Sequence, residues 1–155
     1  MNNFITPDIA LLGHGVLPKE VTDVIITHAD HDHIDGVHHF KNAVIHIQKD
    51  EYERGKRYIP SRFKVNVFDE EFSLDEFTKA IKTGGHQKGS CIVECVNEGK
   101  TYVMCGDEYY SHYNIENKIP TASTRCKENS QYFIDKYCNG DYKCLVSHET
   151  ERIEN

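Results

Sequence analysis

The sequence has little positive charge and no long apolar run. Its 155 residues contain 18 Lys and Arg against 25 Asp and Glu, a formal net charge of −7, and the basic residues are scattered. An acidic surface without a basic patch does not attract polyanions, so we expect no binding to nucleic acid or to an anionic membrane. No apolar stretch approaches the roughly 20 residues that span a bilayer, and no charged leader precedes an apolar segment. We therefore expect a soluble protein.

The cysteines lack the spacing of a metal-binding or redox motif. None of the six forms a Cys-x-x-Cys pair of the kind found in zinc ribbons and redox proteins. Cys91, Cys95 and Cys105 lie in apolar runs typical of strands, where a reduced cysteine packs like a small apolar side chain. These features favour a reduced, cytoplasmic protein.

Several familiar signatures are also missing. The chain has no Ser or Cys nucleophile with a base partner, no phosphate-binding glycine loop and no heptad repeat, which argues against covalent catalysis, P-loop nucleotide binding and coiled-coil assembly. It has no internal repeat, low-complexity tract or linker. With 38% hydrophobic and 28% charged residues, residues 1–155 are expected to form a single domain.

Histidine, in contrast, is abundant and clustered. The chain has ten histidines, and residues 28–35 alone contain three histidines and three aspartates. This segment directly follows the apolar run Val24-Ile25-Ile26, which is typical of a strand. Imidazole nitrogen and carboxylate oxygen are ligands of zinc, iron and manganese, and the end of a strand is a rigid place from which side chains can converge. The cluster therefore predicts a metal site.

The pattern of apolar residues predicts a chain in which strands and helices alternate at first and strands dominate later. A turn at Pro18-Lys19-Glu20 and a hairpin turn at residues 97–100 are expected as well. Helices are expected at residues 8–14, 37–40 (one or two turns), 49–56 and 127–138. Strands are expected at residues 23–27, 44–47, 65–68, 77–82, 91–96, 102–105 and 142–146. The fold class is α/β (α+β).

Three further polar residues, His86, Asp107 and His148, each lie just past a predicted strand. Strand ends at one edge of a sheet are where α/β proteins gather ligands. A lone histidine in such a place is usually an ordinary loop residue. This chain has four such sites in order, counting the cluster that begins at residue 28. Together they indicate one shared centre and not four ordinary loops.

This series resembles the metallo-β-lactamase superfamily, whose pattern is His-x-His-x-Asp-His after a strand, then a glycine-flanked histidine, an aspartate and a last histidine, each after a strand. The resemblance runs from about residue 10 to residue 150 and implies an αββα sandwich. Asp32-His33 fixes the register, so that His28 takes the first position and Asp30 stands where the second histidine is usual.

The resemblance implies a ligand set for two divalent metal ions. One ion would be held by His28, Asp30 and His86, the other by Asp32, His33 and His148, and Asp107 would bridge both. A hydroxide between the ions would be the nucleophile. The residues expected to act in catalysis are Asp32, which could orient the water, Asp107 and His148.

Of the departures from the family pattern, Asp30 has the largest expected effect on the chemistry of the metal site. Three carboxylates and one hydroxide would formally neutralise two divalent ions, which lowers their Lewis acidity. A harder oxygen ligand also shifts preference from zinc, the ion we expect first, toward iron or manganese. Flavodiiron proteins of the same superfamily carry a carboxylate at this position, but they attach a flavin-binding domain for which this chain has no room.

A second departure is the short segment before the motif, because only 27 residues precede His28. We expect the first sheet to be incomplete. An uncovered sheet edge invites association, so we expect a homo-oligomer in which a second copy covers that edge, or a fragile monomer.

The leading hypothesis is a dinuclear metal-dependent hydrolase that cleaves an ester, lactone, amide, thioester or phosphoester bond of a small molecule. The alternatives are a diiron redox or oxygen- or nitric-oxide-handling module, and a degenerate member that binds metal without turnover. His31 is expected to point away from the metals, and His38, His39 and His46 to be surface or packing residues. For four loop residues we expect one of two roles, contact with substrate or exposure to solvent: Lys88, Glu108, Tyr109 and Tyr110.

Overall fold

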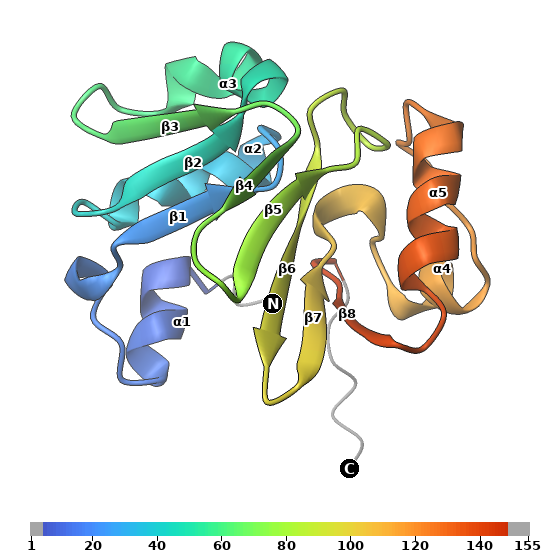
Figure 1. The fold of residues 1–155 in the computed structure, drawn as a ribbon. Coiled ribbons are helices and arrows are strands. Elements are labelled where there is room, and N and C mark those ends of the chain that lie inside the picture. Colours follow the sequence, from blue (N-terminus) through green and yellow to red (C-terminus); the bar gives the residue numbers. More distant parts are fainter. Residues whose placement is uncertain (1–4, 149–155) are drawn as a thin grey trace. The chain divides into compact units, whose positions relative to one another are not determined.

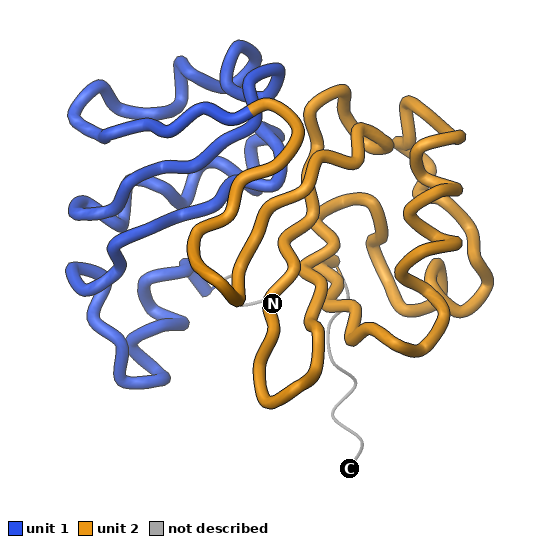
Figure 2. The backbone as a smooth tube through the Cα atoms, in the orientation of Figure 1, with its two compact units in different colours: residues 1–68 blue, residues 69–155 orange. Residues whose placement is uncertain are grey.

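The computed structural model describes residues 5–148 of the chain. These residues belong to two compact units, residues 1–68 (unit 1) and residues 69–155 (unit 2), which are coloured separately in Figure 2. Each unit has its own sheet and its own apolar core. No helix within residues 5–148 is long and apolar enough to cross a membrane.

Unit 1 is built on a parallel three-stranded sheet in the order β1-β2-β3 (Figure 1). The strands are β1 (Asp23–Ile26), β2 (Val44–Gln48) and β3 (Lys64–Phe68). Parallel neighbours need a crossover, and helical segments fill both crossovers here. Because the three strands run in the same direction, their carboxyl ends share one edge of the sheet.

The helices of unit 1 are short. α3 (Lys49–Gly55) begins where the side chain of Gln48 accepts hydrogen bonds from the backbone N–H groups of Asp50, at 2.6 Å, and Glu51, at 3.4 Å. The other α-helices are α1 (Pro7–Gly13) and α2 (His31–Ile34). Short 3-10 helices lie at Pro18–Glu20, Asp35–His39 and Lys56–Tyr58.

Branched aliphatic side chains of the sheet form the core of unit 1. Ile26, Ile45 and Ile47 are at most 2% exposed. Ala29 and Ile34, from the segment that follows β1, pack in the same cluster. The segment after β1 is therefore anchored to the core by its apolar positions, and its polar positions remain for other contacts.

Unit 2 contains a five-stranded sheet in the order β4-β5-β6-β7-β8. Neighbouring strands are antiparallel except β7 and β8, which are parallel. A tight turn joins β6 to β7, and its two central residues, Glu98 (φ 49°) and Gly99 (φ 72°), have the left-handed conformation that hairpin turns favour. The strands are β4 (Glu71–Ser73), β5 (Thr78–Lys82), β6 (Cys91–Asn97), β7 (Lys100–Met104) and β8 (Tyr142–Leu145).

The helix α5 (Lys127–Tyr137) contributes much of the core of unit 2. Its buried residues Ser130, Phe133, Ile134 and Tyr137 recur at the spacing of one helical face. The three larger ones pack with Ile92 and Val103 of the sheet. Unit 2 also contains a 3-10 helix at Gly106–Glu108 and α4 (His112–Glu116).

The structure confirms most of the predicted elements to within one or two residues and corrects three points. The strand β4 and the helix α4 were not predicted. The segment after β1, for which no helix was predicted before residue 37, contains the helix α2. The expectation that Cys91 and Cys105 pack as small apolar side chains is confirmed, since both are free thiols at most 1% exposed.

Candidate metal centre

Four predicted ligands lie together in unit 1, and we call them the His28 cluster: His28, Asp30, Asp32 and His33. His28 follows the end of β1 and is fully buried, Asp30 immediately precedes α2, and Asp32 and His33 lie within α2. His28 Nε2 is 3.5 Å from Asp30 Oδ2, and His33 Nε2 is 3.7 Å from Asp32 Oδ2. The two imidazole rings are 4.1 Å apart between centroids.

Side chains next to the His28 cluster fix its orientation. Thr27 Oγ1 lies 3.2 Å from His28 Nδ1, which leaves Nε2 as the ring nitrogen turned to Asp30. On the other side of Asp30, Arg54 donates from Nη1 to Oδ1 at 2.6 Å. The two oxygens of Asp30 therefore have different surroundings: one faces a guanidinium and the other a histidine.

Helix α3 holds this segment through three residues on one helical face, at positions i, i+3 and i+4. Glu51, 1% exposed, accepts the backbone N–H of Ala29 at 2.8 Å and two hydrogen bonds from Arg54, at 3.0 and 2.6 Å. A Cβ at Gly55 would lie 2.5 Å from Ala29 Cβ, so only glycine allows the helix to approach this closely. Burial lowers the pKa of Arg54, but hydrogen bonds to Glu51 and Asp30 outweigh it and raise the pKa.

Three predicted ligands lie together in unit 2, and we call them the Asp107 cluster: His86, Asp107 and His148. Asp107 follows β7, His86 lies in the loop between β5 and β6, and His148 follows β8. His86 Nε2 is 3.7 Å from Asp107 Oδ2, and His148 Nε2 is 3.0 Å from Asp107 Oδ1. Each carboxylate oxygen of Asp107 therefore faces a different histidine.

The loop that carries His86 is anchored by the buried carboxylate of Glu108. Its Oε1 accepts the backbone N–H groups of Gly85 and His86, both at 3.1 Å. Hydroxyl groups complete its hydrogen bonds, those of Thr83 at 2.6 Å, Ser90 at 2.8 Å and Ser130 at 3.2 Å. Glu108 is 1% exposed, so these five donors compensate the cost of burying its charge.

Ser123 and Tyr110 orient the two histidines of the Asp107 cluster. Ser123 Oγ lies 3.0 Å from His86 Nδ1 and 2.5 Å from the hydroxyl of Tyr110. The ring of Tyr110 packs edge-on against His148 with centroids 4.8 Å apart. Both histidines are thus positioned with Nε2 turned to Asp107.

The donor atoms fit a metal ion in type and in spacing. Zinc lies about 2.0 to 2.2 Å from histidine nitrogen and carboxylate oxygen in tetrahedral sites, so two such ligands are separated by about 3.3 to 3.5 Å. The nitrogen-to-oxygen distances of 3.5, 3.7, 3.7 and 3.0 Å within the two clusters are close to this separation. Nitrogen and oxygen donors together suit zinc, iron or manganese.

The structure gives clear positions to the other residues singled out in the sequence. Tyr109 is 1% exposed in the core of unit 2, so it can neither contact substrate nor face solvent, and both predictions were wrong. The same two predictions were wrong for Glu108. His46 is a packing residue, as expected, with Asp23 Oδ1 at 2.7 Å. His31 is exposed, with its ring 5.8 Å from that of Tyr58.

Sequence reasoning missed Glu51, Arg54 and Ser123. The first two carried a usable signal, because charged residues at positions 51 and 54 and glycine at 55 share one face of a predicted helix. Ser123 carried no signal, since it lies 37 positions from His86 in an irregular segment.

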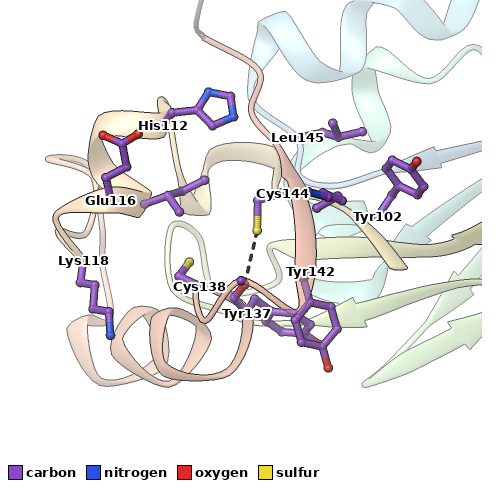
Figure 3. Close-up of a pocket in the computed structure, with 12 residues that line it drawn as sticks. Tyr102, His112, Glu116, Lys118, Tyr137, Cys138, Tyr142, Cys144 and Leu145 are labelled. Carbon is purple, nitrogen blue, oxygen red and sulfur yellow. Dashed lines mark hydrogen bonds between the residues drawn. The ribbon is translucent and has the colours of Figure 1, made fainter. Parts of the chain in front are cut away.

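Of two pockets in the described residues, one in each unit, only the smaller is lined by predicted ligands. A pocket of about 260 Å³ in unit 1 is lined by Asp32 and His33 together with His31, His38 and His39. A larger pocket of about 480 Å³ in unit 2 lies between α4, the end of α5 and β8 (Figure 3). It is lined by Cys138 and Cys144, and Cys144 donates to the carbonyl of Tyr137 at 3.6 Å. None of the seven predicted ligands lines the larger pocket, so of these two pockets the smaller one lies beside predicted ligands.

Several solved structures are similar to this chain. An N-acyl homoserine lactone hydrolase, with the product N-hexanoyl-L-homoserine bound at the catalytic metal center, has a TM-score of 0.76 and 20% identity, over 93% of this chain and 62% of its own. A probable metal-dependent hydrolase from Staphylococcus aureus has a TM-score of 0.73 and 21% identity, over 87% of this chain and 56% of its own.

A third similar structure is AidC, a dizinc quorum-quenching lactonase, with a TM-score of 0.63 and 18% identity over 83% of this chain and 56% of its own. Our chain thus spans about three fifths of the length of these proteins. At such low identity the likeness shows the fold alone, which is the expected mixed α/β fold of the metallo-β-lactamase type.

The family itself is shown by the sequence. A search of curated protein sequences found no match. Residues 4–119, in contrast, match the family model described as the metallo-beta-lactamase superfamily, and this segment is more than half of the chain. The chain therefore belongs to the metallo-β-lactamase superfamily.

Proposed function

We propose that this chain is a dinuclear metal-dependent hydrolase that cleaves an ester, lactone, amide, thioester or phosphoester bond of a small molecule. The observation that carries the proposal is the placement of Asp107, whose Oδ1 faces His148 at 3.0 Å and whose Oδ2 faces His86 at 3.7 Å. A carboxylate with a histidine beside each oxygen is suited to bridge two cations. Membership of the superfamily and the metal centres named in similar structures support the same function.

The proposed ligand sets combine the two clusters. One ion would be held by His28, Asp30 and His86, the other by Asp32, His33 and His148, and Asp107 would bind both. When bound, a pair of divalent ions supplies an activated water at neutral pH and polarises the carbonyl or phosphoryl oxygen of the substrate.

The chain's own residues would orient the reactants. Asp32 has a side chain 60% exposed, so water reaches it, and its carboxylate can accept a proton from the attacking water. Tyr110 packs on His148 and bonds to Ser123, which keeps the exposed His148 turned to Asp107. Glu51 and Glu108, both buried, would act by holding the ligand-bearing loops in place.

Substrate would enter beside Asp32 and His33. The pocket of about 260 Å³ next to them would hold part of a small molecule. N-acyl homoserine lactones are the first substrates to assay, because two of the similar structures are lactone-cleaving enzymes. A carboxylate ester and a phosphodiester complete the panel.

The second candidate is a diiron redox or oxygen- or nitric-oxide-handling module, and Asp30 is the observation that favours it. Asp30 adds an oxygen donor to the His28 cluster, and harder oxygen ligands suit iron and manganese better than zinc. Zinc remains our first choice, because histidine nitrogens supply four of the seven proposed ligands. Iron that changes its visible absorption on reduction would favour the redox candidate, whereas colourless zinc with turnover would favour hydrolysis.

The hydrolase proposal is tested with a substrate panel and two aspartate variants. Wild-type protein loaded with Zn²⁺ or Mn²⁺ is expected to turn over at least one lactone, ester or phosphodiester. Asp107→Ala is expected to abolish that turnover, and the exposed turn residue Asp141 supplies the control Asp141→Ala, which is expected to keep it. A metal-loaded protein that is inactive on all three substrate types would instead indicate a degenerate member that binds metal without turnover.

We also propose a homo-oligomer in a reduced, cytoplasmic setting. Within residues 5–148, β1 and β3 form the two edges of the sheet of unit 1, and exposed strand edges favour association. Ile5, Ile9 and Leu12 on and beside α1 are 48 to 59% exposed and add apolar surface. The alternative is a fragile monomer. Light scattering after size exclusion tests this proposal, and a robust, compact monomer would contradict it.

A further inference from the structure

We propose that Arg54, fixed by Glu51, is a positioning residue that makes Asp30 present one oxygen, Oδ2, to a metal ion and thereby favours zinc over manganese. The inference rests on the proposed metal-binding function and deepens it. It concerns residues of unit 1 only.

The contacts of Arg54 separate the two oxygens of Asp30. Arg54 Nη1 donates to Asp30 Oδ1 at 2.6 Å, while Asp30 Oδ2 lies 3.5 Å from His28 Nε2. The second separation is close to that of two ligands on one tetrahedral ion, about 3.3 to 3.5 Å. An oxygen engaged by a guanidinium at 2.6 Å is a poor second donor, so Asp30 is held as a one-oxygen ligand.

Arg54 is itself held rigidly, unlike most arginines with a partly exposed side chain. Its Nε and Nη2 both donate to Glu51 Oε2, at 3.0 and 2.6 Å. The Glu51 side chain is 2% exposed and also accepts the backbone N–H of Ala29, the residue before Asp30. Glu51 and Arg54 of helix α3 therefore bind the same loop at two points, the backbone of Ala29 and the side chain of Asp30.

Gly55 brings helix α3 close enough for these contacts. A side chain there would collide with Ala29 and Ile34, on the two sides of Asp30 in the sequence. The helix contacts the ligand segment through packing, a backbone hydrogen bond and an ion pair. A residue that positions a metal ligand must itself be held by several contacts, as Arg54 is here. A chance ion pair on the surface lacks such support.

The predicted effect is on metal preference. Manganese favours oxygen ligands and six-coordinate sites, whereas zinc in proteins is usually held by four ligands. Released from Arg54, Asp30 could offer both oxygens to one ion. Removing Arg54 should therefore weaken zinc binding and weaken manganese binding less, whereas simple loss of a nearby positive charge would tighten the binding of both ions.

The test measures dissociation constants for Zn²⁺ and Mn²⁺ by competition with a chelator of known affinity. We expect Arg54→Met to raise the zinc Kd about 10- to 100-fold, the usual effect of losing a residue that orients a metal ligand. The ratio of the manganese Kd to the zinc Kd should fall. The visible absorption of the Co²⁺-loaded variant should weaken, as it does when the coordination number rises.

Arg54→Lys separates positioning from charge. Lysine keeps the charge against buried Glu51 but lacks the planar fork, so it should also lose zinc affinity if positioning matters. It also provides the test if Arg54→Met fails to fold. The control is Arg62→Met, since Arg62 packs over the ring of Phe63 at 4.8 Å and lies outside helix α3 and the segment that carries Asp30.

Three results have distinct meanings. Zinc and manganese affinities equal to wild type in both Arg54 variants, or tighter zinc binding in Arg54→Met, would overturn the positioning role. Weaker zinc binding with an unchanged preference and Co²⁺ spectrum would also overturn it, because a merely structural role predicts that pattern. A wild-type protein that binds neither ion would instead refute the proposed function.

Discussion

His148 lies with its Nε2 3.0 Å from Asp107 Oδ1, although the two residues are 41 positions apart in the sequence. The parallel pairing of β7 with β8 brings them together. Met104 pairs with Leu145 at the end of the two strands, and each of the two proposed ligands follows its strand by three residues. Because parallel strands end at the same edge of a sheet, this register sets the contact.

Asp107 and His148 should differ in the amount of metal that their loss removes. As the proposed bridge, Asp107 binds both ions, so Asp107→Ala should lose nearly all bound metal. His148→Ala removes a ligand of one ion only and should retain about one equivalent per chain. Metal analysis of the dialysed proteins measures both values. His14→Ala, at an exposed histidine outside both clusters, should match wild type, and equal stoichiometry in all variants would contradict the bridge.

Glu108 should be important for stability as well as for the His86 loop. Glu108→Ala leaves the N–H groups of Gly85 and His86 without their acceptor, and each buried unpaired donor costs about 1 to 3 kcal/mol. We therefore expect the free energy of unfolding to fall by about 2 to 6 kcal/mol, measured by urea denaturation of metal-free protein. Glu71→Ala, on exposed β4, is the matched control and should change stability by less than about 0.5 kcal/mol. A Glu108→Ala variant as stable as this control would refute the anchoring role.

Gly55 and Gly13 offer a paired test of the α3 contact. A Cβ at Gly55 would meet Ala29 Cβ at 2.5 Å and Ile34 Cδ1 at 2.8 Å, so Gly55→Ala should destabilise unit 1 by about 1 to 3 kcal/mol. Nothing lies within 4 Å of a Cβ at Gly13, and helix propensity there favours alanine by up to about 1 kcal/mol. Thermal unfolding should therefore shift down for Gly55→Ala only. An unchanged midpoint for Gly55→Ala would show that α3 does not need the close approach.

Asp23 should contribute to stability in a way that depends on pH. Hydrogen bonds from His46, at 2.7 Å, and from Thr22 lower the pKa of Asp23 below its ordinary value of 3.8. A lowered pKa in the folded state means that the stabilisation is present above the unfolded value and is lost as pH falls through the folded value. The stability difference between wild type and Asp23→Asn should be constant near neutral pH and shrink below pH 3.8. Denaturation curves between pH 2.5 and 7 check this, and a difference independent of pH would contradict it.

Much of the candidate centre could be read from the sequence because the proposed ligands follow strands with clear apolar runs. His86, Asp107 and His148 are isolated in sequence, but each comes after a strand that the pattern of apolar residues marks. The segment after β1 was recognisable from composition alone. The spacing of apolar residues and the ends of strands depend on neighbouring residues in the chain, so they can be predicted from a single sequence.

The residues that support the ligands could not be found in the same way. Glu108 looked like a solvent-facing or substrate-contacting carboxylate because burial of a charge depends on five donors from distant parts of unit 2. Tyr109 was misjudged for a similar reason, since helix α5 covers it with Phe133 at 5.2 Å between ring centroids. The short strand β4 was missed because pairing with β5, and not its own sequence, defines it.

The central claim is that two cations bind to the ligands of the His28 and Asp107 clusters. The most direct measurement is elemental analysis of the protein purified without chelator and dialysed against metal-free buffer. We predict about two equivalents of divalent metal per chain, zinc first, and near-complete loss of metal in Asp107→Ala. Less than a tenth of an equivalent of any transition metal in the wild-type protein, together with no uptake when Zn²⁺, Mn²⁺ or Fe²⁺ is added, would contradict the account.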